Sequence, residues 1–513
     1  MKYKIKYLIV GGGIGGLNAG LSLIEKGIKG SEIMIIEKSY RFGGKINTIY
    51  LKDMDINFEC GAGRFTNNHK LLIKYIKRYN LSDQIRELSN EKEYYIRNSK
   101  DPEKVFKVET EIKLDPYNLI KKVIDESRNR DYSEDYLSSI TFKELCIDII
   151  GNESTIFLID SFGYNSEFEI LNGNDAIRIF KNDFNIKNKY YVLGGGLSQI
   201  IQSMTDELIK KNVRLILKTK LLDFRYVEKR FKSKFTDDIE IESKYMILAL
   251  DKIALLKLDI LKDIEDLIKS VDTVKLNRIY GIFPKGKNGK VWFDGIPKTT
   301  TDLPIRQFIP INAKKGLAMV SYSDSEYAED WQDKVINGTS KRYIMRYLHK
   351  MFPNSIIPAP TLIDYHYWYN GTHCWLTHVN SSKIKRRLIK PYERIDLYIC
   401  GEVFSDNQGW IEGALETSDK VVKMIKNKED IKYKYYSESE IEKHNKETDG
   451  WTIINNRVYD ITEWINIHPG GKIIINALGK DGTNMFKYYN HPDYAKRILE
   501  NYFIGYVKNK KSI

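Results

Sequence analysis

Residues 7–27 read YLIVGGGIGGLNAGLSLIEKG, an apolar run followed by a glycine-rich turn and a segment with helical periodicity. Gly11, Gly13 and Gly16 stand in GxGxxG order between the predicted strand and the predicted helix, and Gly15 lies among them. This arrangement turns the chain tightly, brings the backbone close to a pyrophosphate and points a helix N-terminus at its charge. The stretch therefore predicts an α/β, Rossmann-like dinucleotide-binding domain.

A second strand and an acidic residue strengthen this prediction. Residues 32–38, EIMIIEK, predict a strand that ends at Glu37, 21 residues after Gly16. A carboxylate at this point can accept hydrogen bonds from ribose hydroxyls. Lys38 follows directly and joins the predicted cofactor-binding residues. A GxGxxG motif alone is weak, but the two strands and the acid favour a dinucleotide site over a plain glycine-rich turn.

Two further stretches indicate which dinucleotide is bound. Residues 37–48, EKSYRFGGKINT, carry Arg41, a glycine pair and Lys45, and they resemble the second phosphate-side motif of the flavin amine oxidase family. Residues 58–65, FECGAGRF, look like the next flavin-facing strand and turn of that family. The resemblance implies FAD, because the glycines admit the isoalloxazine end and a cation balances the pyrophosphate charge.

A third matching stretch lies far along the chain, at residues 397–422, LYICGEVFSDNQGWIEGALETSDKVV. It is similar to the closing motif of the family, in which a strand, a G-E pair and a helix N-terminus face the flavin. Trp410 would face the substrate side of the ring, and residues 213–224 would supply a strand pair near the adenine. The resemblance as a whole implies FAD binding by Gly11, Gly13, Gly15, Gly16, Glu37, Lys38, Arg41, Gly43, Gly44, Lys45, Gly61, Ala62, Gly63, Arg64, Leu221, Gly401, Glu402, Gly409, Trp410 and Ile411.

The catalytic residues follow from the same resemblance. Family members commonly use a strand lysine to hold a water against the flavin, and residues 272–284, DTVKLNRIYGIFP, place Arg278 in that position with Lys275 as the poorer fit. An arginine stays charged where a desolvated lysine can lose its proton, so lysine-dependent oxygen chemistry does not carry over. Trp375 is expected opposite Trp410, the two rings enclosing a substrate nitrogen.

The cysteines and nearby histidines predict no metal site in this part of the chain. Cys374 lies near a position where some relatives bind FAD covalently, but the spacing is imperfect, and a buried free thiol is expected instead. The histidines within residues 366–378 lack a metal-ligand pattern and are expected to be structural or to line the pocket. No CxxC pair occurs among the four cysteines, Cys60, Cys146, Cys374 and Cys400.

The C-terminal region carries a second set of motifs. Residues 451–471, WTIINNRVYDITEWINIHPGG, closely resemble a cytochrome b5-like haem domain. His468 matches the first axial ligand of such domains, and His491, 23 residues further on, matches the second. Two imidazoles saturate the iron, so the resemblance implies a haem that carries single electrons rather than binding oxygen. Because no CxxCH motif is present, haem b would be held non-covalently.

Composition limits the other functions. Lysine and arginine outnumber acidic residues by 82 to 69, a net charge of +13, but the basic residues are scattered and no nucleic-acid-reading motif accompanies them. No run of 18 apolar residues occurs, so no transmembrane segment is expected. We expect a cytoplasmic protein, and the composition also suits a large DNA virus, in which case the host cytoplasm or the virion would hold it. Oligomeric state is not determined by the sequence.

These observations predict the domain organisation. Residues 1–425 form the flavin amine oxidase-like region, with a discontinuous FAD-binding domain at about 1–70, 190–270 and 390–425. An inserted α+β substrate domain takes about 71–189 and 271–389. A linker at 426–433 leads to a small α+β cytochrome b5-like domain at 434–508.

The predicted function is an FAD-dependent amine oxidoreductase. A small-molecule amine gives a hydride to the flavin and becomes an imine, and the electrons pass to the bis-histidine haem, to another redox partner or to oxygen. Two alternatives stay open. One is an FAD-dependent C–C desaturase or porphyrinogen-type oxidase on the same scaffold, and the other is a catalytically degenerate flavoprotein that serves as a binding or scaffold module.

Overall fold

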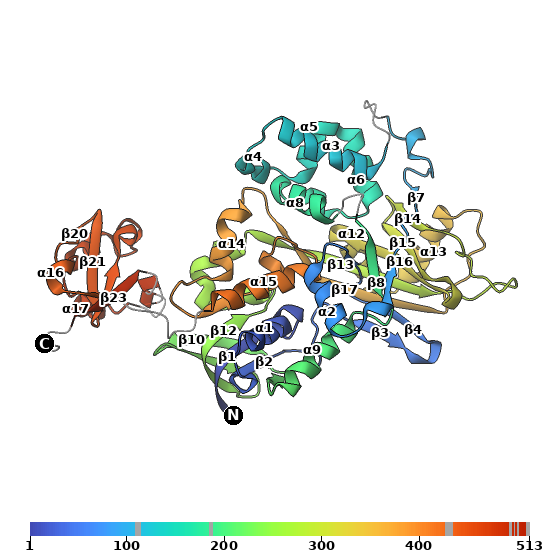
Figure 1. The fold of residues 1–513 in the computed structure, drawn as a ribbon. Coiled ribbons are helices and arrows are strands. Elements are labelled where there is room, and N and C mark those ends of the chain that lie inside the picture. Colours follow the sequence, from blue (N-terminus) through green and yellow to red (C-terminus); the bar gives the residue numbers. More distant parts are fainter. Residues whose placement is uncertain are drawn as a thin grey trace.

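The computed structural model describes residues 1–107, 114–183, 188–425, 434–491, 495–496, 498–499 and 502–508. Figure 1 shows a larger body formed by the first 425 residues, with a smaller domain built by the C-terminal residues beside it. The predicted linker at 426–433 lies outside the described residues. Both the α/β class of the larger body and the small α+β C-terminal domain are confirmed.

The larger body contains a seven-stranded sheet built from distant parts of the chain. Its order is β10-β11-β12-β1-β2-β9, and β18 pairs with β12. The central pairs β1–β12, β1–β2, β2–β9 and β12–β18 are parallel, as a Rossmann-like sheet requires. The strands are β1 (Lys2–Val10), β2 (Ile33–Ile36), β9 (Arg214–Ile216), β10 (Leu221–Val227), β11 (Arg230–Phe235), β12 (Glu240–Leu248) and β18 (Leu397–Ile399).

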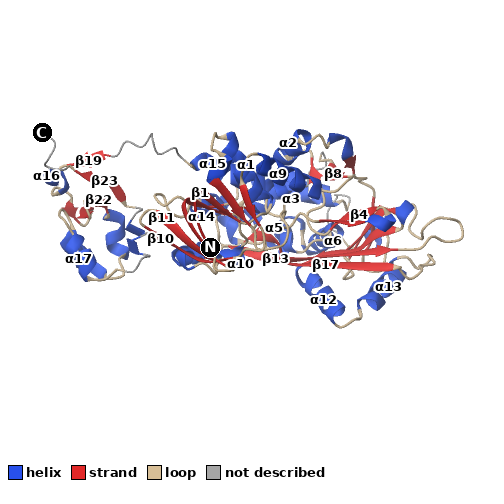
Figure 2. Cartoon of the chain, turned by 90° about the horizontal axis from the view of Figure 1, so that it is seen from below, coloured by secondary structure: helices blue, strands red, loops and turns tan. Residues whose placement is uncertain are grey.

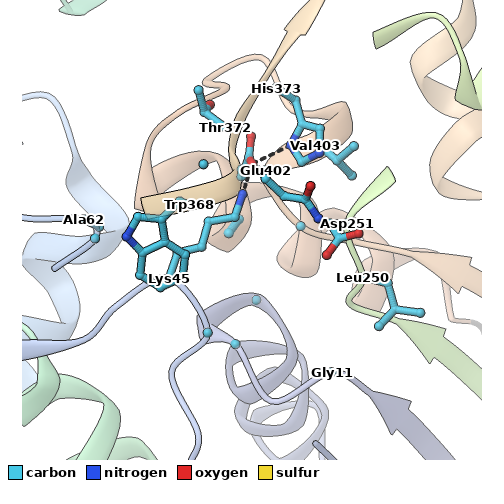
Figure 3. Close-up of a pocket in the computed structure, with 18 of the residues that line it drawn as sticks. Gly11, Lys45, Ala62, Leu250, Asp251, Trp368, Thr372, His373, Glu402 and Val403 are labelled. Carbon is cyan, nitrogen blue, oxygen red and sulfur yellow. Dashed lines mark hydrogen bonds and ion pairs between the residues drawn. The ribbon is translucent and has the colours of Figure 1, made fainter. Parts of the chain in front are cut away.

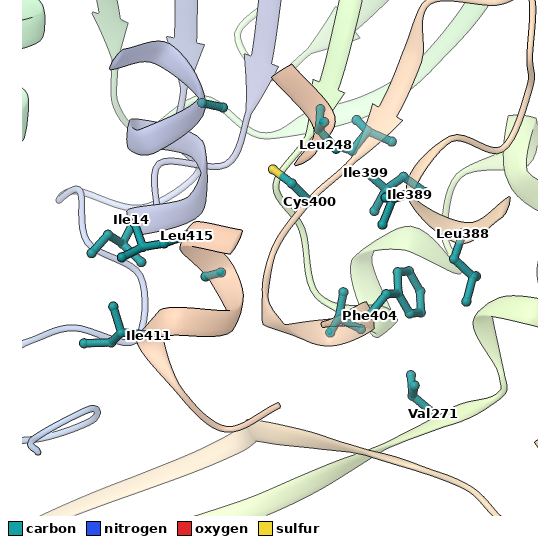
Figure 4. Close-up of a cluster of buried hydrophobic side chains, with 14 of the residues drawn as sticks. Ile14, Leu248, Val271, Leu388, Ile389, Ile399, Cys400, Phe404, Ile411 and Leu415 are labelled. Atoms are coloured by element: carbon teal, nitrogen blue, oxygen red, sulfur yellow. The ribbon is translucent and has the colours of Figure 1, made fainter. Parts of the chain in front are cut away.

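Two helices from opposite ends of this region pack together above the sheet. They are α1 (Ile14–Glu25) and α15 (Ile411–Met424), and α9 (Ser198–Lys210) packs on the other side of α1. Asn18 joins the pair, because its Nδ2 donates to Ser418 Oγ at 2.7 Å and to Asp419 Oδ1 at 2.9 Å. Figure 4 shows Ile14, Ile411 and Leu415 meeting at this contact. The glycine-rich turn before α1 is thereby held against the start of α15.

A six-stranded sheet forms the second layer, in the order β17-β13-β16-β15-β14-β7. All its pairs are antiparallel except β14–β7. Figure 2 shows the long strands β13 and β17 extending away from the first sheet, with α12 (Ser325–Ile336) and α13 (Ser340–Met351) on one side. The strands are β7 (Lys92–Tyr95), β13 (Val271–Ile282), β14 (Lys298–Thr301), β15 (Gln307–Asn312), β16 (Leu317–Asp324) and β17 (Leu362–Trp375).

A helical lobe covers the opposite side of the second sheet (Figure 1). Aromatic rings fill its interior, with Phe142 stacked on Phe180 at 4.7 Å between centroids. Smaller elements connect the two layers: the hairpin β3 (Thr48–Leu51) and β4 (Ile56–Glu59), the strands β5 (Phe65–Thr66), β6 (Ile85–Glu87) and β8 (Tyr190–Leu193), and the helices α2 (Lys70–Arg78), α10 (Lys252–Leu255), α11 (Glu265–Ile268) and α14 (Ser381–Ile389). The helices of the lobe are α3 (Pro116–Asn129), α4 (Glu134–Ser139), α5 (Phe142–Ile150), α6 (Asn152–Phe162), α7 (Ser166–Glu169) and α8 (Gly173–Asp183).

The C-terminal domain has its own five-stranded sheet and its own core. The sheet order is β19-β23-β22-β21-β20, and one apolar cluster includes Tyr459, Ile465 and Phe503. Its elements are β19 (Lys434–Tyr436), α16 (Glu438–Ile441), β20 (Asn445–Lys446), β21 (Asp449–Ile454), β22 (Arg457–Asp460), α17 (Thr483–Tyr488) and β23 (Phe503–Val507). Within the described ranges, none of the helices combines the length and the apolar character that a bilayer span needs.

Candidate functional site

One cavity of about 1160 Å³ runs between the two sheets of the larger body. It lies at the carboxyl ends of β1 and β12, where parallel α/β sheets bind their ligands. Figure 3 shows its wall formed by segments far apart in the chain, among them Gly11, Ala62, Trp368 and Glu402. The structure places all the sequence-predicted FAD residues in this wall: Gly11, Gly13, Gly15, Gly16, Glu37, Lys38, Arg41, Gly43, Gly44, Lys45, Gly61, Ala62, Gly63, Arg64, Leu221, Gly401, Glu402, Gly409, Trp410 and Ile411.

The glycine turn has little room for side chains on its inner side. A Cβ on Gly11 would lie 2.2 Å from the carbonyl oxygen of Ala249, and one on Gly16 would lie 2.0 Å from the carbonyl oxygen of Gly11. Gly11 also has φ +108°, a conformation that favours glycine. At Gly13, by contrast, the nearest atom to such a Cβ is 4.0 Å away. The turn therefore packs tightly against β12 and leaves backbone exposed to the cavity, as a pyrophosphate site requires.

The charged residues near the turn are held by backbone groups. Glu37 is 8 % exposed, and its two carboxylate oxygens accept hydrogen bonds from the backbone N–H of Gly12 at 2.7 Å and of Ser39 at 2.8 Å. Arg41 donates to the carbonyl oxygens of Gly44 at 2.7 Å and Ile46 at 2.9 Å. Arg41 thus fixes the shape of the second glycine turn in addition to lining the cavity.

A buried ion network crosses the cavity wall (Figure 3). Glu402 Oε1 lies 2.6 Å from Lys45 Nζ and 2.6 Å from His373 Nδ1, so the second and third sequence motifs meet there. Burial opposes ionisation of Glu402, but Lys45 and His373 outweigh it and hold the pKa of this carboxyl well below its usual range. His373, expected to be structural or to line the pocket, does line it.

Several polar atoms of β17 lack a partner at the cavity wall. Asn370 Oδ1, Thr372 Oγ1 and His373 Nε2 are buried without a hydrogen bond among the described residues, and all three side chains line the cavity. Buried polar groups are nearly always hydrogen-bonded in folded proteins. These atoms fit a cavity that receives a polar cofactor, and the residues present are therefore compatible with FAD.

Arg278 lines the cavity, whereas Lys275 does not. Arg278 is 8 % exposed, donates to the carbonyl oxygen of Glu59 at 3.0 Å and has its guanidinium 4.5 Å from the centroid of Tyr322. Lys275 is outside the cavity wall and pairs with Glu329 on α12. Of the two predicted candidates, only the arginine is placed to meet a ligand.

The two predicted tryptophans do not face each other. Trp410 lines the cavity, but Trp375 is fully buried behind it, where its indole N–H donates to the Ser405 carbonyl oxygen at 3.2 Å. The expected pairing is therefore corrected: Trp368 is the tryptophan of β17 that lines the cavity. Its indole N–H donates to the Cys60 carbonyl oxygen at 2.7 Å, which fixes the ring against the turn after β4.

Acidic groups at the cavity were missed from the sequence. Glu167 and Asp324 both line it, and Asp324 accepts hydrogen bonds from the backbone N–H groups of Asn165 and Ser166. Burial first, and then the neighbouring Asp324, raise the pKa of Glu167 to about 7. No motif marks either residue, because α7 and β16 bring them together only in the folded chain.

All four cysteines are free and buried. Cys374 lines the cavity, and burial raises the pKa of its thiol well above the ordinary value. A protonated thiol is a poor nucleophile, which agrees with the expected buried free thiol rather than a covalent flavin link.

The two C-terminal histidines form a matched pair. Their ring centroids are 6.2 Å apart, and imidazoles bound at about 2 Å on opposite sides of one metal have centroids about 6 Å apart. His468 Nδ1 is 3.0 Å from the Gly471 carbonyl oxygen, and His491 Nδ1 is 3.0 Å from the Phe486 carbonyl oxygen. Both contacts assign the proton to Nδ1 and leave each Nε2 as a metal ligand. The residues present fit a bis-histidine haem.

The described residues thus combine a cavity suited to a dinucleotide with a separate pair of histidines suited to haem. Residues 14–425 match the family described as Flavin containing amine oxidoreductase, and the chain belongs to this family. Residues 437–508 match the Cytochrome b5-like Heme/Steroid binding domain. The cofactors are accordingly FAD and haem b.

Solved structures and curated proteins agree with this division. Putrescine oxidase bound to putrescine has a TM-score of 0.63 at 14 % identity, covering 82 % of this chain and 99 % of that chain, which shows a shared fold. Delta(5) fatty acid desaturase A of Dictyostelium discoideum is 45 % identical over 95 residues, and Cytochrome b5 isoform E of Arabidopsis thaliana is 43 % identical over 75 residues. These matches cover 18 % and 14 % of this chain, and 19 % and 56 % of the respective relatives.

Proposed function

We propose that this protein is an FAD-dependent amine dehydrogenase that passes its electrons to its own haem domain. The observation that carries the proposal is one continuous cavity, which extends from the glycine turn to an aromatic and charged chamber around Trp410, Trp368 and Glu167. When bound, FAD accepts a hydride from a C–H bond next to nitrogen and bis-histidine haem carries single electrons. The residues of the chamber bind and orient the substrate.

The chamber offers groups suited to an amine. Trp410 and Trp368 both line the cavity, and aromatic rings attract cationic nitrogen. Glu167 Oε2 accepts a hydrogen bond from Ser166 Oγ at 3.0 Å, and with a pKa of about 7 it exchanges protons near neutral pH. Glu167 is thus suited to take the proton that a substrate ammonium must lose before oxidation.

Arg278 favours the haem over oxygen as the electron acceptor. Its guanidinium is fixed by the Glu59 carbonyl and by Tyr322, and an arginine does not give up its proton. It therefore cannot serve as the proton-exchanging lysine on which oxygen chemistry in the family commonly depends. This replacement of the family's usual lysine by an arginine supports electron transfer to the haem domain.

A contact between the two parts of the chain also supports this route. The guanidinium of Arg394, just before β18, lies 4.6 Å from the ring centroid of Phe503 on β23. Further into the haem domain, Tyr502 is 5.9 Å from Trp464, and Trp464 is 6.5 Å from His468. Aromatic side chains thus lie between the contact and the first haem ligand.

Anaerobic spectra of the purified full chain test the proposal. Adding a panel of amines should remove the flavin absorbance and then produce the spectrum of reduced bis-histidine haem. The matched control is His468→Ala, in which the flavin should still be reduced and no haem signal should follow. Loss of flavin absorbance with a haem that stays ferric, together with stoichiometric peroxide in air, would establish an oxidase instead.

A further inference from the structure

One side of helix α17, in the C-terminal domain, is open to solvent (Figure 1). Residues three and four positions apart share one side of a helix, and Asn484, Lys487 and Tyr488 have this spacing. All three are exposed, and Tyr488 is 82 % exposed in the full chain. Tyr489 follows at 48 % exposure. The larger body therefore leaves this side of the haem domain uncovered.

The open side lies within one helical turn of the second predicted haem ligand. The ring of Phe486, on the inner side of α17, stacks on the His491 imidazole with centroids 4.3 Å apart and planes 2° apart. Lys487 and Tyr488 come next in the chain and are exposed. A protein that contacts these two side chains would therefore approach the iron site from the His491 side.

Positive charge dominates the segment that holds both histidines. Residues 468–491 contain three basic residues and one acid, which are Lys472, Lys480, Lys487 and Asp481. Lys480 and Lys487 are exposed, and neither forms an ion pair in the parts of the chain that the structure describes. The Asp481 carboxylate accepts the backbone N–H of Thr483 at 2.9 Å. An exposed aromatic surface with two unpaired lysines thus lies next to His491.

The rest of the chain does not complement this surface. Residues 434–467 hold seven acidic and four basic residues, so the acids of the domain gather before the first ligand. Residues 434–513 together hold 12 basic and 10 acidic residues, so most of the net charge of +13 belongs to the residues before them. The larger body meets the domain elsewhere, where Arg394 lies 4.6 Å from the Phe503 ring centroid.

We propose that Lys480, Lys487, Tyr488 and Tyr489 form an exit face, on which a separate electron-acceptor protein with an acidic surface docks. A hydride brings two electrons to the flavin, and each docking removes one electron through the haem. Two acceptor molecules are therefore reduced for each amine oxidised. The direction of electron flow rests on the proposed function, whereas the docking itself does not.

The lysines and the tyrosines of the exit face have different tasks. Unpaired surface lysines raise the encounter rate with a partner of opposite charge, and this effect weakens with salt. Tyr488 and Tyr489 meet edge to face with centroids 5.2 Å apart, and together they present a rigid aromatic surface. Exposed tyrosines of this kind are typical of the energetically important centre of an interface. The lysines therefore attract the partner and the tyrosines hold it.

Stopped-flow oxidation of the FAD- and haem-loaded full chain tests the docking. The chain is reduced with dithionite and then mixed with oxidised plastocyanin, an acidic acceptor protein, or with cytochrome c, a basic one. At low salt, plastocyanin should oxidise the haem faster than cytochrome c does. Its rate constant should fall about tenfold from about 10 to 200 mM salt, whereas the rate constant for cytochrome c should not fall.

Charge reversal on the exit face gives the decisive variant. Lys480→Glu combined with Lys487→Glu should slow oxidation by plastocyanin about tenfold or more at low salt. The matched control is Lys443→Glu combined with Lys446→Glu, which changes the charge equally at exposed lysines before the first ligand. Tyr488→Ala should weaken plastocyanin binding and keep the salt dependence. Haem absorbance per chain verifies that each variant retains its haem.

Several results would overturn the proposal. Equal slowing in the control pair would show an effect of net charge alone, and faster oxidation by cytochrome c at low salt would reverse the sign of the partner. Binding to phosphatidylserine vesicles that Tyr488→Ala abolishes, with unchanged plastocyanin rates, would assign the exit face to a membrane. A sedimenting dimer that Tyr488→Ala dissociates would assign it to a second copy. Because dithionite replaces the amine, these outcomes are separate from the amine test.

Discussion

The flavin cavity and the haem site are built in opposite ways. The predicted haem ligands His468 and His491 lie within one stretch of 24 residues, and each is oriented by a carbonyl three or five positions away. The flavin cavity takes its wall from residues between Val10 and Ala414, and its central ion network joins Lys45 to Glu402. The haem site therefore depends on local sequence, and the flavin site depends on the assembly of the whole body.

The largest effect should come from the haem ligands. His468→Ala or His491→Ala removes one of two imidazole ligands, and we expect complete loss of bound haem with unchanged flavin content. Haem and flavin absorbance per chain measure this. Loss of flavin together with haem would show that the two sites are not independent.

The next effect should come from the glycine turn. Gly16→Ala places a Cβ 2.0 Å from a carbonyl oxygen, and overpacking of this kind costs about 1–3 kcal/mol of stability. We expect loss of FAD and a lower melting temperature for the larger body, while haem content is retained. Gly13→Ala is the matched control for stability alone, because the nearest protein atom to its Cβ would be 4.0 Å away, although the residue faces the cavity. An equal fall in melting temperature in both variants would contradict this explanation.

Lys45→Met should have an intermediate effect. It leaves Glu402 buried without its closest cation, and we expect a loss of about 1–3 kcal/mol at pH 7, since the Lys45 side chain is 32 % exposed. The pKa of Glu402 is depressed in the folded protein, so this stabilisation is present above the unfolded pKa and disappears as the pH falls through the folded value. Denaturant titrations of both proteins at pH 7 and pH 4 measure it. If the stability difference between the two proteins grows from pH 7 to pH 4, the ion pair is excluded as its source.

The smallest effect should come from the contact between the two parts. Arg394→Ala removes a cation–π contact with Phe503, worth about 0.5–1 kcal/mol at an exposed site. We expect the free energy of unfolding of the haem domain, measured by denaturant titration, to fall by no more than that amount, and haem binding to stay intact. A larger effect would mean that the haem domain depends on the larger body for its stability.

The glycine turn and the acid after β2 could be predicted because short-range patterns encode them, and the two histidines predicted as haem ligands also lie in such patterns. The substrate side of the cavity could not be predicted in this way. Trp375 was expected in the cavity and is buried, whereas Trp368 lines it. The reason is an irregular stretch of β17, where Thr372 pairs with Val274 but Trp368 pairs with Leu276. Four positions of β17 lie opposite two positions of β13 at this point. The alternation of side chains on one side of this irregular stretch therefore does not predict which side chains face the cavity on the other side.

Glu167 belongs to no motif at all. Its carboxylate is ordinary in the sequence, and its raised pKa depends on burial and on Asp324, which a distant strand supplies. By itself, the sequence determined the family, the two cofactors and the residues of the short glycine-rich and HPGG stretches. Only the tertiary structure decided which side chains share the chamber and which of them are buried, because desolvation and pairing are properties of the assembled interior.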